Sequence, residues 1–286
     1  MSAAIITKDL RKQYGELWAV DGIDLEIEQG ECFAILGPNG AGKTTTTEIL
    51  EGFRTATSGE VFVLGEEPAA AGPEWKARIG VVLQSSRDLE ELRVIEAVRH
   101  FAGYYPSPRD VEEVIEAVGL TEKQNDRNGR LSGGQRRRLD VALGIIGSPE
   151  ILFLDEPTTG FDPEARRNFW DLIEGLKTEG TTIVLTTHYL DEAEALADRV
   201  GVISRGKLIA CDTPADLGGR QEGKARVTWQ EAGVDREEFT ETPTVLVREL
   251  ADRFAGAEIP ELAVARPSLE DIYLAMIGHD LQAVSE

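Results

Sequence analysis

The sequence has few of the features that mark secreted, membrane-spanning or disulfide-linked proteins. Its 286 residues include only two cysteines, which are far apart and lie in apolar runs, so we expect reduced core residues and neither a disulfide nor a metal site. No apolar run reaches about 18 residues, the minimum for a membrane span. The N-terminus lacks the basic and apolar regions of a signal peptide. These absences predict a soluble cytoplasmic protein.

Positive charge is also scarce. The chain has 30 basic and 52 acidic residues, which gives a formal net charge of −22. Nucleic-acid-binding proteins normally carry a basic footprint, so this balance argues against that class. The length is sufficient for a sizeable core and for one or two domains.

One stretch carries a complete phosphate-binding motif. Gly37 to Thr44 reads G-P-N-G-A-G-K-T, which fits the pattern G-x-x-x-x-G-K-[ST]. The apolar run Cys32–Leu36 before it predicts a buried strand, and Thr45–Leu50 can start a helix. This context favours a phosphate loop over an ordinary glycine turn. Lys43 is expected to reach the β- and γ-phosphates, and the Thr44 hydroxyl to bind Mg²⁺.

Polar residues at the ends of other predicted strands form a second set of candidates. Asp155 and Glu156 follow an apolar run, where Asp155 is placed to hold Mg²⁺ and Glu156 to orient or deprotonate a water. A strand that simply ends at the surface is the alternative. Gln84 and His188 also end strand-like runs, but each is as readily an ordinary loop or structural residue. Tyr14 is either an adenine-stacking aromatic or an edge aromatic.

Helical periodicity dominates from about Leu89 to Gly147, which predicts a helical insertion in an α/β domain. One of its helices begins at Leu131–Gln135, which reads L-S-G-G-Q. Ser132 to Gln135 fits a capping box, but two glycines in a first turn destabilise a helix and allow a phosphate to approach its N–H groups. The run Arg136–Arg138 is interpreted as solvated or partner-facing.

Beyond Gly218–Gly219 the composition becomes polar and acidic, and we expect a small appended α/β unit, most simply a stabilising cap. The predicted domains are 1–219, with a helical subdomain at about 89–149, and 220–286. Short elements are expected as follows: a helix starting at Thr213–Pro214, a strand at Thr244–Val247, a helix at Arg248–Phe254, a strand at Ile259–Val264 and a helix at Ser268–Ile277.

Five motifs in a fixed order resemble the nucleotide-binding subunit of ATP-binding cassette transporters. They are G-P-N-G-A-G-K-T, Gln84, L-S-G-G-Q, I-L-F-L-D-E-P and His188. The L-S-G-G-Q sequence is the specific part, because most other P-loop proteins lack it. The tail Pro267–Gly278 looks like the end of the drug-resistance, daunorubicin-type export subfamily. The resemblance implies a P-loop NTPase (RecA-like) core with an inserted helical subdomain.

The resemblance also implies roles for individual residues in ATP and Mg²⁺ binding. Catalysis would involve Glu156 as the general base, His188 at the γ-phosphate and Lys43. The Mg²⁺ ligands would be Thr44, Gln84 and Asp155. ATP would be bound by Tyr14, Gly37, Pro38, Asn39, Gly40, Ala41, Gly42, Lys43, Thr44, Thr45 and Gln84, and, from the opposite subunit, by Ser132, Gly133, Gly134 and Gln135. The family loop after D-E-P commonly reads G-L-D, whereas here it is Gly160–Asp162, G-F-D.

By resemblance, the chain is expected to be the ATP-hydrolysing subunit of an exporter. Two copies would sandwich two ATP molecules and drive separate transmembrane permease subunits from the inner face of the cell membrane. The alternative is a soluble cassette ATPase that acts on nucleic acid or ribosomes. Such chains usually carry two cassettes or long coiled-coil insertions, and this chain has neither. A module that binds ATP without hydrolysing it is disfavoured because all the catalytic positions are intact.

Overall fold

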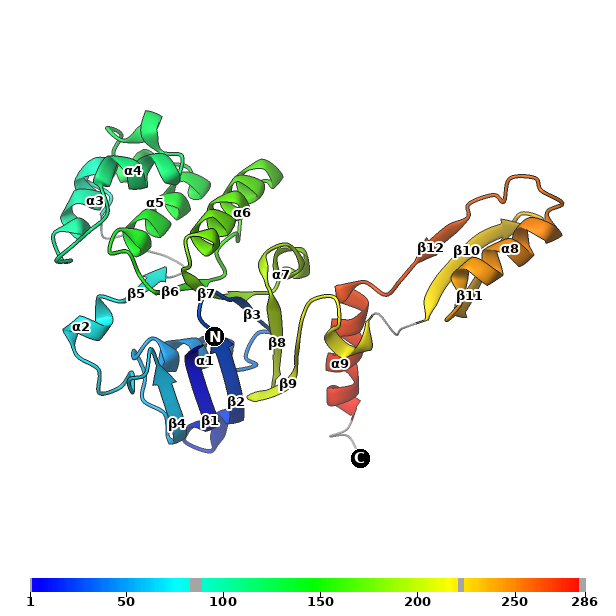
Figure 1. The fold of residues 1–286 in the computed structure, drawn as a ribbon, viewed down its shortest axis with the longest axis horizontal. Helices are drawn as coiled ribbons and strands as arrows, with labels where there is room; N and C mark the ends of the chain where they lie inside the picture. Colours follow the sequence, from blue (N-terminus) through cyan, green and yellow to red (C-terminus); the bar gives the residue numbers. More distant parts are fainter. Residues whose placement is uncertain (1, 83–88, 221–223, 283–286) are drawn as a thin grey trace. The chain divides into compact units, whose positions relative to one another are not determined.

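The computed structural model describes residues 2–82, 89–220 and 224–282, with only the backbone at 279–282. The chain divides into two units, Met1–Cys211 and Asp212–Glu286, and each is described here by itself (Figure 1). The predicted domain boundary at 219/220 and the limits of the helical subdomain stay predictions.

A six-stranded sheet organises the first unit, in the order β5-β6-β7-β3-β8-β9. The β5–β6, β6–β7, β7–β3 and β3–β8 pairs are all parallel. Strands covered on both faces read as near-continuous apolar runs, which is why β3, β6 and β7 are so hydrophobic. The strands are β3 (Cys32–Leu36), β5 (Ile79–Val82), β6 (Ile151–Asp155), β7 (Thr182–Thr187), β8 (Arg199–Ser204) and β9 (Lys207–Asp212).

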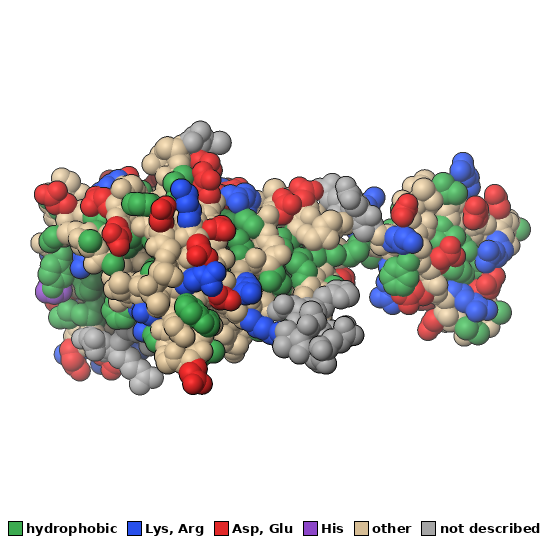
Figure 2. Space-filling view, turned by 90° about the horizontal axis from the view of Figure 1, so that it is seen from below, with side chains coloured by type: hydrophobic (Ala, Val, Ile, Leu, Met, Phe, Trp, Pro, Cys, Tyr) green, Lys and Arg blue, Asp and Glu red, His purple; other side chains and the backbone are tan. Residues whose placement is uncertain are grey.

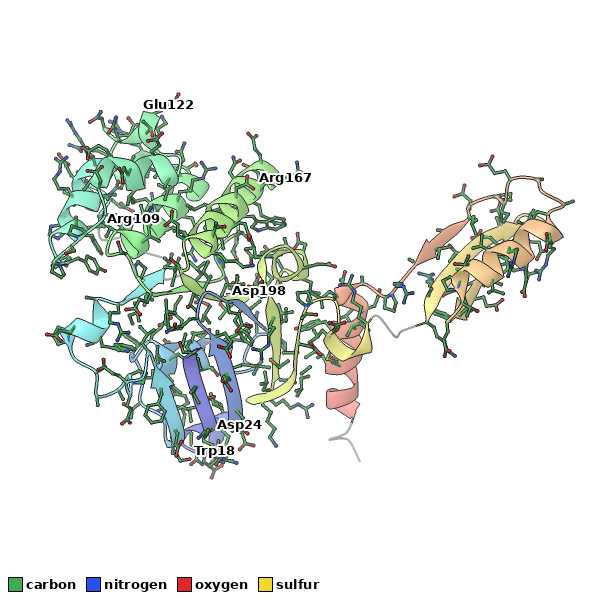
Figure 3. The ribbon with its side chains drawn as sticks, in the orientation of Figure 1. Trp18, Asp24, Arg109, Glu122, Arg167 and Asp198 are labelled. Carbon is green, nitrogen blue, oxygen red and sulfur yellow. The ribbon has the colours of Figure 1, made fainter. Side chains whose placement is uncertain are left out.

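A second sheet of the first unit is antiparallel and has the order β2-β1-β4. Strands β1 and β2 each span 12 residues. In Figure 3, Trp18 and Asp24 are labelled on β2 of this sheet. Its strands are β1 (Ala3–Tyr14), β2 (Leu17–Glu28) and β4 (Ser58–Val63).

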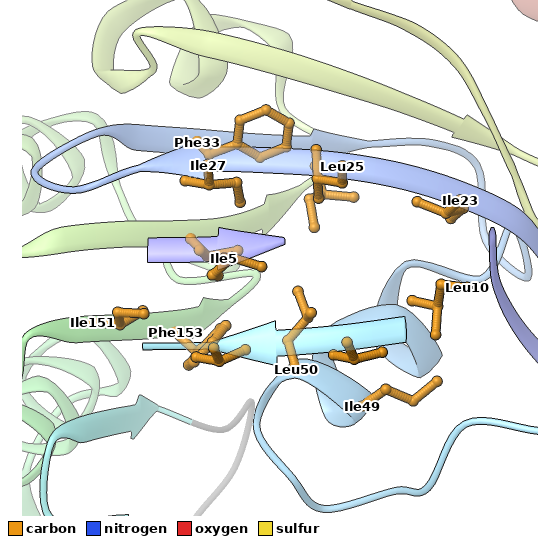
Figure 4. Close-up of a cluster of buried hydrophobic side chains, with 14 of the residues drawn as sticks. Ile5, Leu10, Ile23, Leu25, Ile27, Phe33, Ile49, Leu50, Ile151 and Phe153 are labelled. Atoms are coloured by element: carbon orange, nitrogen blue, oxygen red, sulfur yellow. The ribbon is translucent and has the colours of Figure 1, made fainter. Parts of the chain in front are cut away.

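Side chains from both sheets and from helix α1 (Lys43–Leu50) meet in one apolar cluster (Figure 4). Ile5 and Ile27 come from the antiparallel sheet, Phe33 and Phe153 from the parallel sheet, and Leu50 from α1; all are essentially inaccessible to solvent. Burial of each such side chain contributes roughly 1.5–3 kcal/mol to folding. The cluster fixes α1, and with it the segment before α1, against the central sheet.

In the described part of the insertion between β5 and β6, three α-helices lie together in Figure 1. They are α3 (Val94–Ala102), α4 (Val111–Ala117) and α5 (Gly133–Ile145). The Asp110 carboxylate caps α4 by accepting a hydrogen bond from the Glu113 N–H at 3.0 Å. Arg109, labelled in Figure 3, pairs with Glu179 at 2.9 Å beyond the end of α6. The expected helical insertion is therefore present.

The remaining helices of the first unit are α2 (Pro73–Lys76), α6 (Pro163–Thr178) and α7 (Leu190–Leu196). Helix α6 has Asp162 as N-cap and Pro163 in the first turn. Asp198, labelled in Figure 3, follows α7; its carboxylate accepts hydrogen bonds from the Cys32 N–H at 2.9 Å and the Lys177 ammonium at 2.7 Å. This contact ties the start of β3 to the second half of the unit.

The second unit is a three-stranded antiparallel sheet, β11-β10-β12, with helix α8 packed on it, and a separate helix α9. Val227, Trp229, Leu246 and Leu250 form its buried core. Its elements are β10 (Ala225–Glu231), β11 (Val234–Thr240), α8 (Pro243–Arg253), β12 (Ala263–Ala265) and α9 (Leu269–Gln282).

Two expectations for this region were wrong. The predicted strand Thr244–Val247 is part of helix α8, because Leu246 and Leu250, four residues apart, face β10 together. The predicted helix at Thr213–Pro214 is a turn followed by a short 3₁₀ segment at Leu217–Gly219. The polar and acidic stretch after Gly219, for which the sequence predicted no strand, contains β10 and β11.

Candidate functional site

The candidate residues lie at one edge of the parallel sheet. Strands β6, β7 and β3 are adjacent and parallel, so their carboxyl ends meet at the same edge. Asp155 is in register with Thr186, and Leu36 with Thr187. The strand order therefore brings together the three segments that begin at Gly37, Glu156 and His188, which are far apart in the sequence.

The phosphate loop takes its shape from glycines that tolerate close backbone contacts. A side chain at Gly37 would collide with the carbonyl oxygen of Ile203, and one at Gly42 with that of Ala19. Gly42 also has φ of +108° as the N-cap of α1, a conformation that L-residues adopt at a cost. Backbone carbonyls of β2 and β8 thus leave room only for glycine at these two positions of the loop. The loop ends at the positive N-terminus of α1.

Lys43 lies across this loop. Its ammonium donates hydrogen bonds to the carbonyl oxygens of Gly37 at 2.7 Å and Pro38 at 3.3 Å, and its side chain is largely buried. Burial lowers the pKa of Lys43, whereas the nearby carboxylates of Glu156 and Asp155 raise it. Lys43, Asp155 and Glu156 are therefore close enough to interact electrostatically, as expected if all three contribute to one site.

Asp155 is held by a side chain that the sequence analysis did not single out. The Thr186 hydroxyl donates a hydrogen bond to Asp155 Oδ1 at 2.5 Å. This leaves further lone pairs of the carboxylate for a cation, and Thr44 at the start of α1 is exposed. Among the described residues no group of three or more His, Cys, Asp or Glu could hold a metal. One carboxylate, one hydroxyl and substrate phosphates are the donor set that suits Mg²⁺.

Glu156 and His188 face each other. His188 Nδ1 lies 3.3 Å from Glu156 Oε1, and the two side chains are 43% and 18% exposed. Glu156 has a positive φ of 45°, and its N–H donates to the Thr186 carbonyl oxygen at 3.0 Å. A constrained backbone of this kind is common at functional sites. The geometry joins a carboxylate and an imidazole beside the phosphate loop.

The environment of Arg137 differs from the one that the sequence predicted. It was expected to be solvated or partner-facing, but it is buried, and its guanidinium donates to the Asp155 carbonyl oxygen at 2.5 Å and to that of Pro157 at 3.1 Å. Burial lowers its pKa, against the effect of nearby carboxylates. The adjacent Arg136 and Arg138 gave no sequence signal that distinguished the middle residue.

The L-S-G-G-Q segment lines a different cavity, of about 460 Å³. Ser132 and Gln135 form the predicted capping box: the Gln135 N–H donates to Ser132 Oγ at 3.2 Å, and the Ser132 N–H donates to Gln135 Oε1 at 3.0 Å. The other wall comes from Gly160–Asp162 and the start of α6. None of the described lining residues belongs to the phosphate loop, so the two motifs do not form one cavity within a chain.

The remaining two predicted site residues are Tyr14 and Gln84. Tyr14 is 40% exposed at the end of β1, and its ring centre lies 5.2 Å from the Lys12 ammonium and 5.8 Å from the Arg54 guanidinium carbon. Gln84 lies outside the described residues. The roles assigned to individual residues stay predictions.

The fold and the phosphate loop define a P-loop nucleoside triphosphate hydrolase. A family model described as ABC transporter matches residues 20–159. The chain is 36% identical to a Nod factor export ATP-binding protein I of Cupriavidus pinatubonensis, over 99% of this chain and 93% of that protein. It is also 36% identical to a daunorubicin resistance ATP-binding protein of Streptomyces coeruleorubidus, over 96% and 95%.

Among solved structures, the chain resembles a dimeric bacterial ABC transporter cassette with a TM-score of 0.65 and 25% identity, over 73% of this chain and 98% of that one. The protein therefore belongs to the ATP-binding cassette family, as an ATP-binding, ATP-hydrolysing subunit of an export-type transporter. The predicted fold class and family are confirmed. None of the helices in the described residues is both long and apolar enough to cross a bilayer.

Proposed function

We propose that two copies of this chain pair head to tail and bind two Mg²⁺-ATP molecules between them. Each site combines residues 37–45 of one copy with Ser132–Gln135 of the other. The observation that supports this arrangement is that the L-S-G-G-Q cavity contains no phosphate-loop residue among those described. The similarity to a cassette whose structure is dimeric adds support.

In the proposed reaction, the protein positions ATP and an attacking water. Backbone N–H groups of the phosphate loop and Lys43 bind the phosphates, and Tyr14 stacks on adenine. Thr44, Gln84 and Asp155 would hold Mg²⁺, which would supply positive charge to the phosphate oxygens. Glu156 accepts the proton of the water, and His188, 3.3 Å from it, contacts the γ-phosphate and holds the carboxylate in place.

The partners that we propose are separate transmembrane permease subunits on the inner face of the membrane. A cavity of about 490 Å³ with a mostly apolar lining lies between α1, β5 and the helical insertion. Phe53 at its edge is 78% exposed, which is unusual for a large apolar side chain unless a partner covers it. We assign this cavity to a cytoplasmic segment of the permease. The relatives' names support export and drug resistance, without fixing the substrate.

The decisive experiment uses Glu156→Gln, which removes the base and keeps the shape of the side chain. We expect the rate of ATP hydrolysis to fall at least about 100-fold while ATP affinity stays within about threefold. Pull-down of this variant with Mg-ATP from detergent-solubilised membranes should recover a polytopic membrane protein. Glu174→Gln, which changes an exposed glutamate of α6, is the matched control and should hydrolyse ATP normally.

If Glu156→Gln hydrolyses ATP at the wild-type rate, the assignment of Glu156 as the base is wrong. Recovery of an ATP-bound dimer together with nucleic acid, and without a membrane protein, would favour the cytosolic alternative. That alternative has little electrostatic support, because acidic and basic side chains are interspersed on the face in Figure 2 and no continuous basic stripe is visible there.

A further inference from the structure

A fully buried carboxyl group beside the site has no place in the mechanism above. Glu192 in helix α7 is 0% exposed. Neither of its carboxyl oxygens makes a hydrogen bond of normal geometry to a described residue. A buried, charged carboxylate without such bonds is strongly destabilising, so this group needs a specific explanation.

Two buried threonine hydroxyls lie beside it. Burial raises the pKa of Glu192, and the side chains of Thr187 and Thr158 act in the opposite direction. Both threonines are 0% exposed, and the Thr158 hydroxyl also lacks a hydrogen bond of normal geometry. The three groups can satisfy one another if the carboxyl is protonated, because it then both donates and accepts.

The two threonines belong to the two segments that carry chemistry after β6 and β7. Thr158 lies two residues after Glu156, and its carbonyl oxygen accepts a hydrogen bond from the Phe161 N–H at 3.0 Å, in the turn that reaches the L-S-G-G-Q cavity. Thr187 directly precedes His188, and its hydroxyl accepts from the Tyr189 N–H at 3.0 Å. Glu192 therefore lies between the backbone that places Glu156 and the backbone that places His188.

Charged groups surround Glu192 from several elements. Arg166 of α6 lowers its pKa and Asp191 of α7 raises it. Arg137 of α5 and Cys32 of β3 also lie within electrostatic range of Glu192. Arg166 is bound by Asp191 at 2.9 Å and stacks 4.8 Å from the Tyr189 ring centre. No described cation forms an ion pair with Glu192 itself, which favours a neutral carboxyl.

We propose that Glu192 is a positioning residue for ATP hydrolysis. In neutral form its carboxyl accepts a hydrogen bond from Thr187 and donates one to Thr158, and so holds the segment of Glu156 and the segment of His188 in fixed relation. It touches neither ATP nor water. This role goes beyond the proposed assignment of the base, because it concerns what keeps Glu156 and His188 3.3 Å apart.

The first test compares Glu192→Gln with Glu192→Ala in the full chain. Glutamine keeps a group that donates and accepts, so we expect kcat within about twofold of wild type; alanine should lower kcat about tenfold with little change in KM. Glu194→Gln, at an exposed position of the same helix, is the matched control. A loss with glutamine as large as with alanine, or wild-type kcat for Glu192→Ala, would overturn the proposal.

Because Glu192→Ala leaves a cavity and can unfold the chain, a second pair of variants tests the same contact. Thr158→Val removes only the hydroxyl, and Thr158→Ser keeps it. We expect Thr158→Val to lower kcat about as much as Glu192→Ala, and Thr158→Ser to restore most of it. The double variant Glu192→Gln/Thr158→Val should lose no more than Thr158→Val alone. Unchanged kcat in Thr158→Val would refute the bridge.

The pH profile separates positioning from a purely structural role. Wild-type kcat should decline over the pH range in which Glu192 ionises, whereas kcat of Glu192→Gln should not show this step. Identical profiles for the two proteins would show that the carboxyl does not act in its neutral form. If Glu156 is not the base, Glu156→Gln keeps its ATPase activity, whatever the Glu192 variants do. Failure of the base assignment is therefore distinguishable from failure of the positioning role.

Discussion

The parallel sheet of the first unit is much more buried than the antiparallel sheet of the second unit. Every residue of β3 and β7 in the first unit is buried, and their loops carry the site. In the described part of the second unit, every residue of β12 is exposed and so are nearly all residues of β11, and the apolar cluster beneath α8 contains four buried residues. A parallel sheet buried on both faces holds polar groups at its edge rigidly, whereas a sheet covered on one face contributes fewer fixed contacts.

This difference bears on how each unit responds to a substitution. In the first unit the functional loops are packed against backbone atoms of other strands, so small changes there should damage both stability and function. In the second unit a core substitution should damage that unit and leave ATP chemistry intact. Three substitutions sharpen or break this contrast.

The largest effect is expected from Gly42→Ala. The new methyl group collides with the carbonyl of Ala19 at a position with φ of +108°, so we expect a destabilisation of about 4 kcal/mol and loss of ATP binding. Urea unfolding and binding of a fluorescent ATP analogue measure the two effects. Gly175→Ala is the control, because α6 leaves open space there and alanine should stabilise the helix slightly. Normal ATP binding by Gly42→Ala would contradict the packing of the loop.

A smaller effect is expected from Leu250→Ala in α8. Leu250 is fully buried against β10, and its truncation should cost the second unit about 3 kcal/mol. Hydrogen exchange should show faster exchange of amides in α8 and β10, with β3 and β6 unchanged and ATP hydrolysis normal. Val245→Ala, at a largely exposed position of the same helix, is the control. A matching loss of protection in β3 would show that the units do not respond separately.

The smallest effect concerns Glu51, which lines the apolar cavity assigned to the permease. Burial, with help from Asp155 and Glu48, raises its pKa from 4.5 to about 7. A carboxyl with a raised folded pKa stabilises the fold below about pH 4.5 and loses this contribution as the pH rises to about 7.

The Glu51→Gln variant should therefore gain about 2 kcal/mol relative to wild type between pH 4.5 and pH 8. Urea unfolding of both proteins across this range is the measurement. Glu74→Gln, at an exposed position of α2, should show no such pH-dependent difference. Parallel stability curves for wild type and Glu51→Gln would mean that solvent reaches this carboxyl freely.

The sequence predicted the first unit well because its signals are local. The glycines of the phosphate loop and the apolar runs before Asp155 and His188 each act over a few residues. In the second unit, the β-branched stretch in Thr244–Val247 suggested a strand, but packing of Leu246 and Leu250 on β10 made it helical. Such a choice depends on a partner surface that the local sequence does not contain.

The residues themselves determined that this protein has a phosphate loop, a strand-end pair of carboxylates and the L-S-G-G-Q segment, because each motif is short and its residue types are required by backbone geometry. Only the tertiary structure decided which of three consecutive arginines is buried, that Thr186 holds Asp155, and that the buried Glu192 lies beside Thr158 and Thr187. These outcomes follow from the order of parallel strands, which brings distant segments to one edge of the sheet.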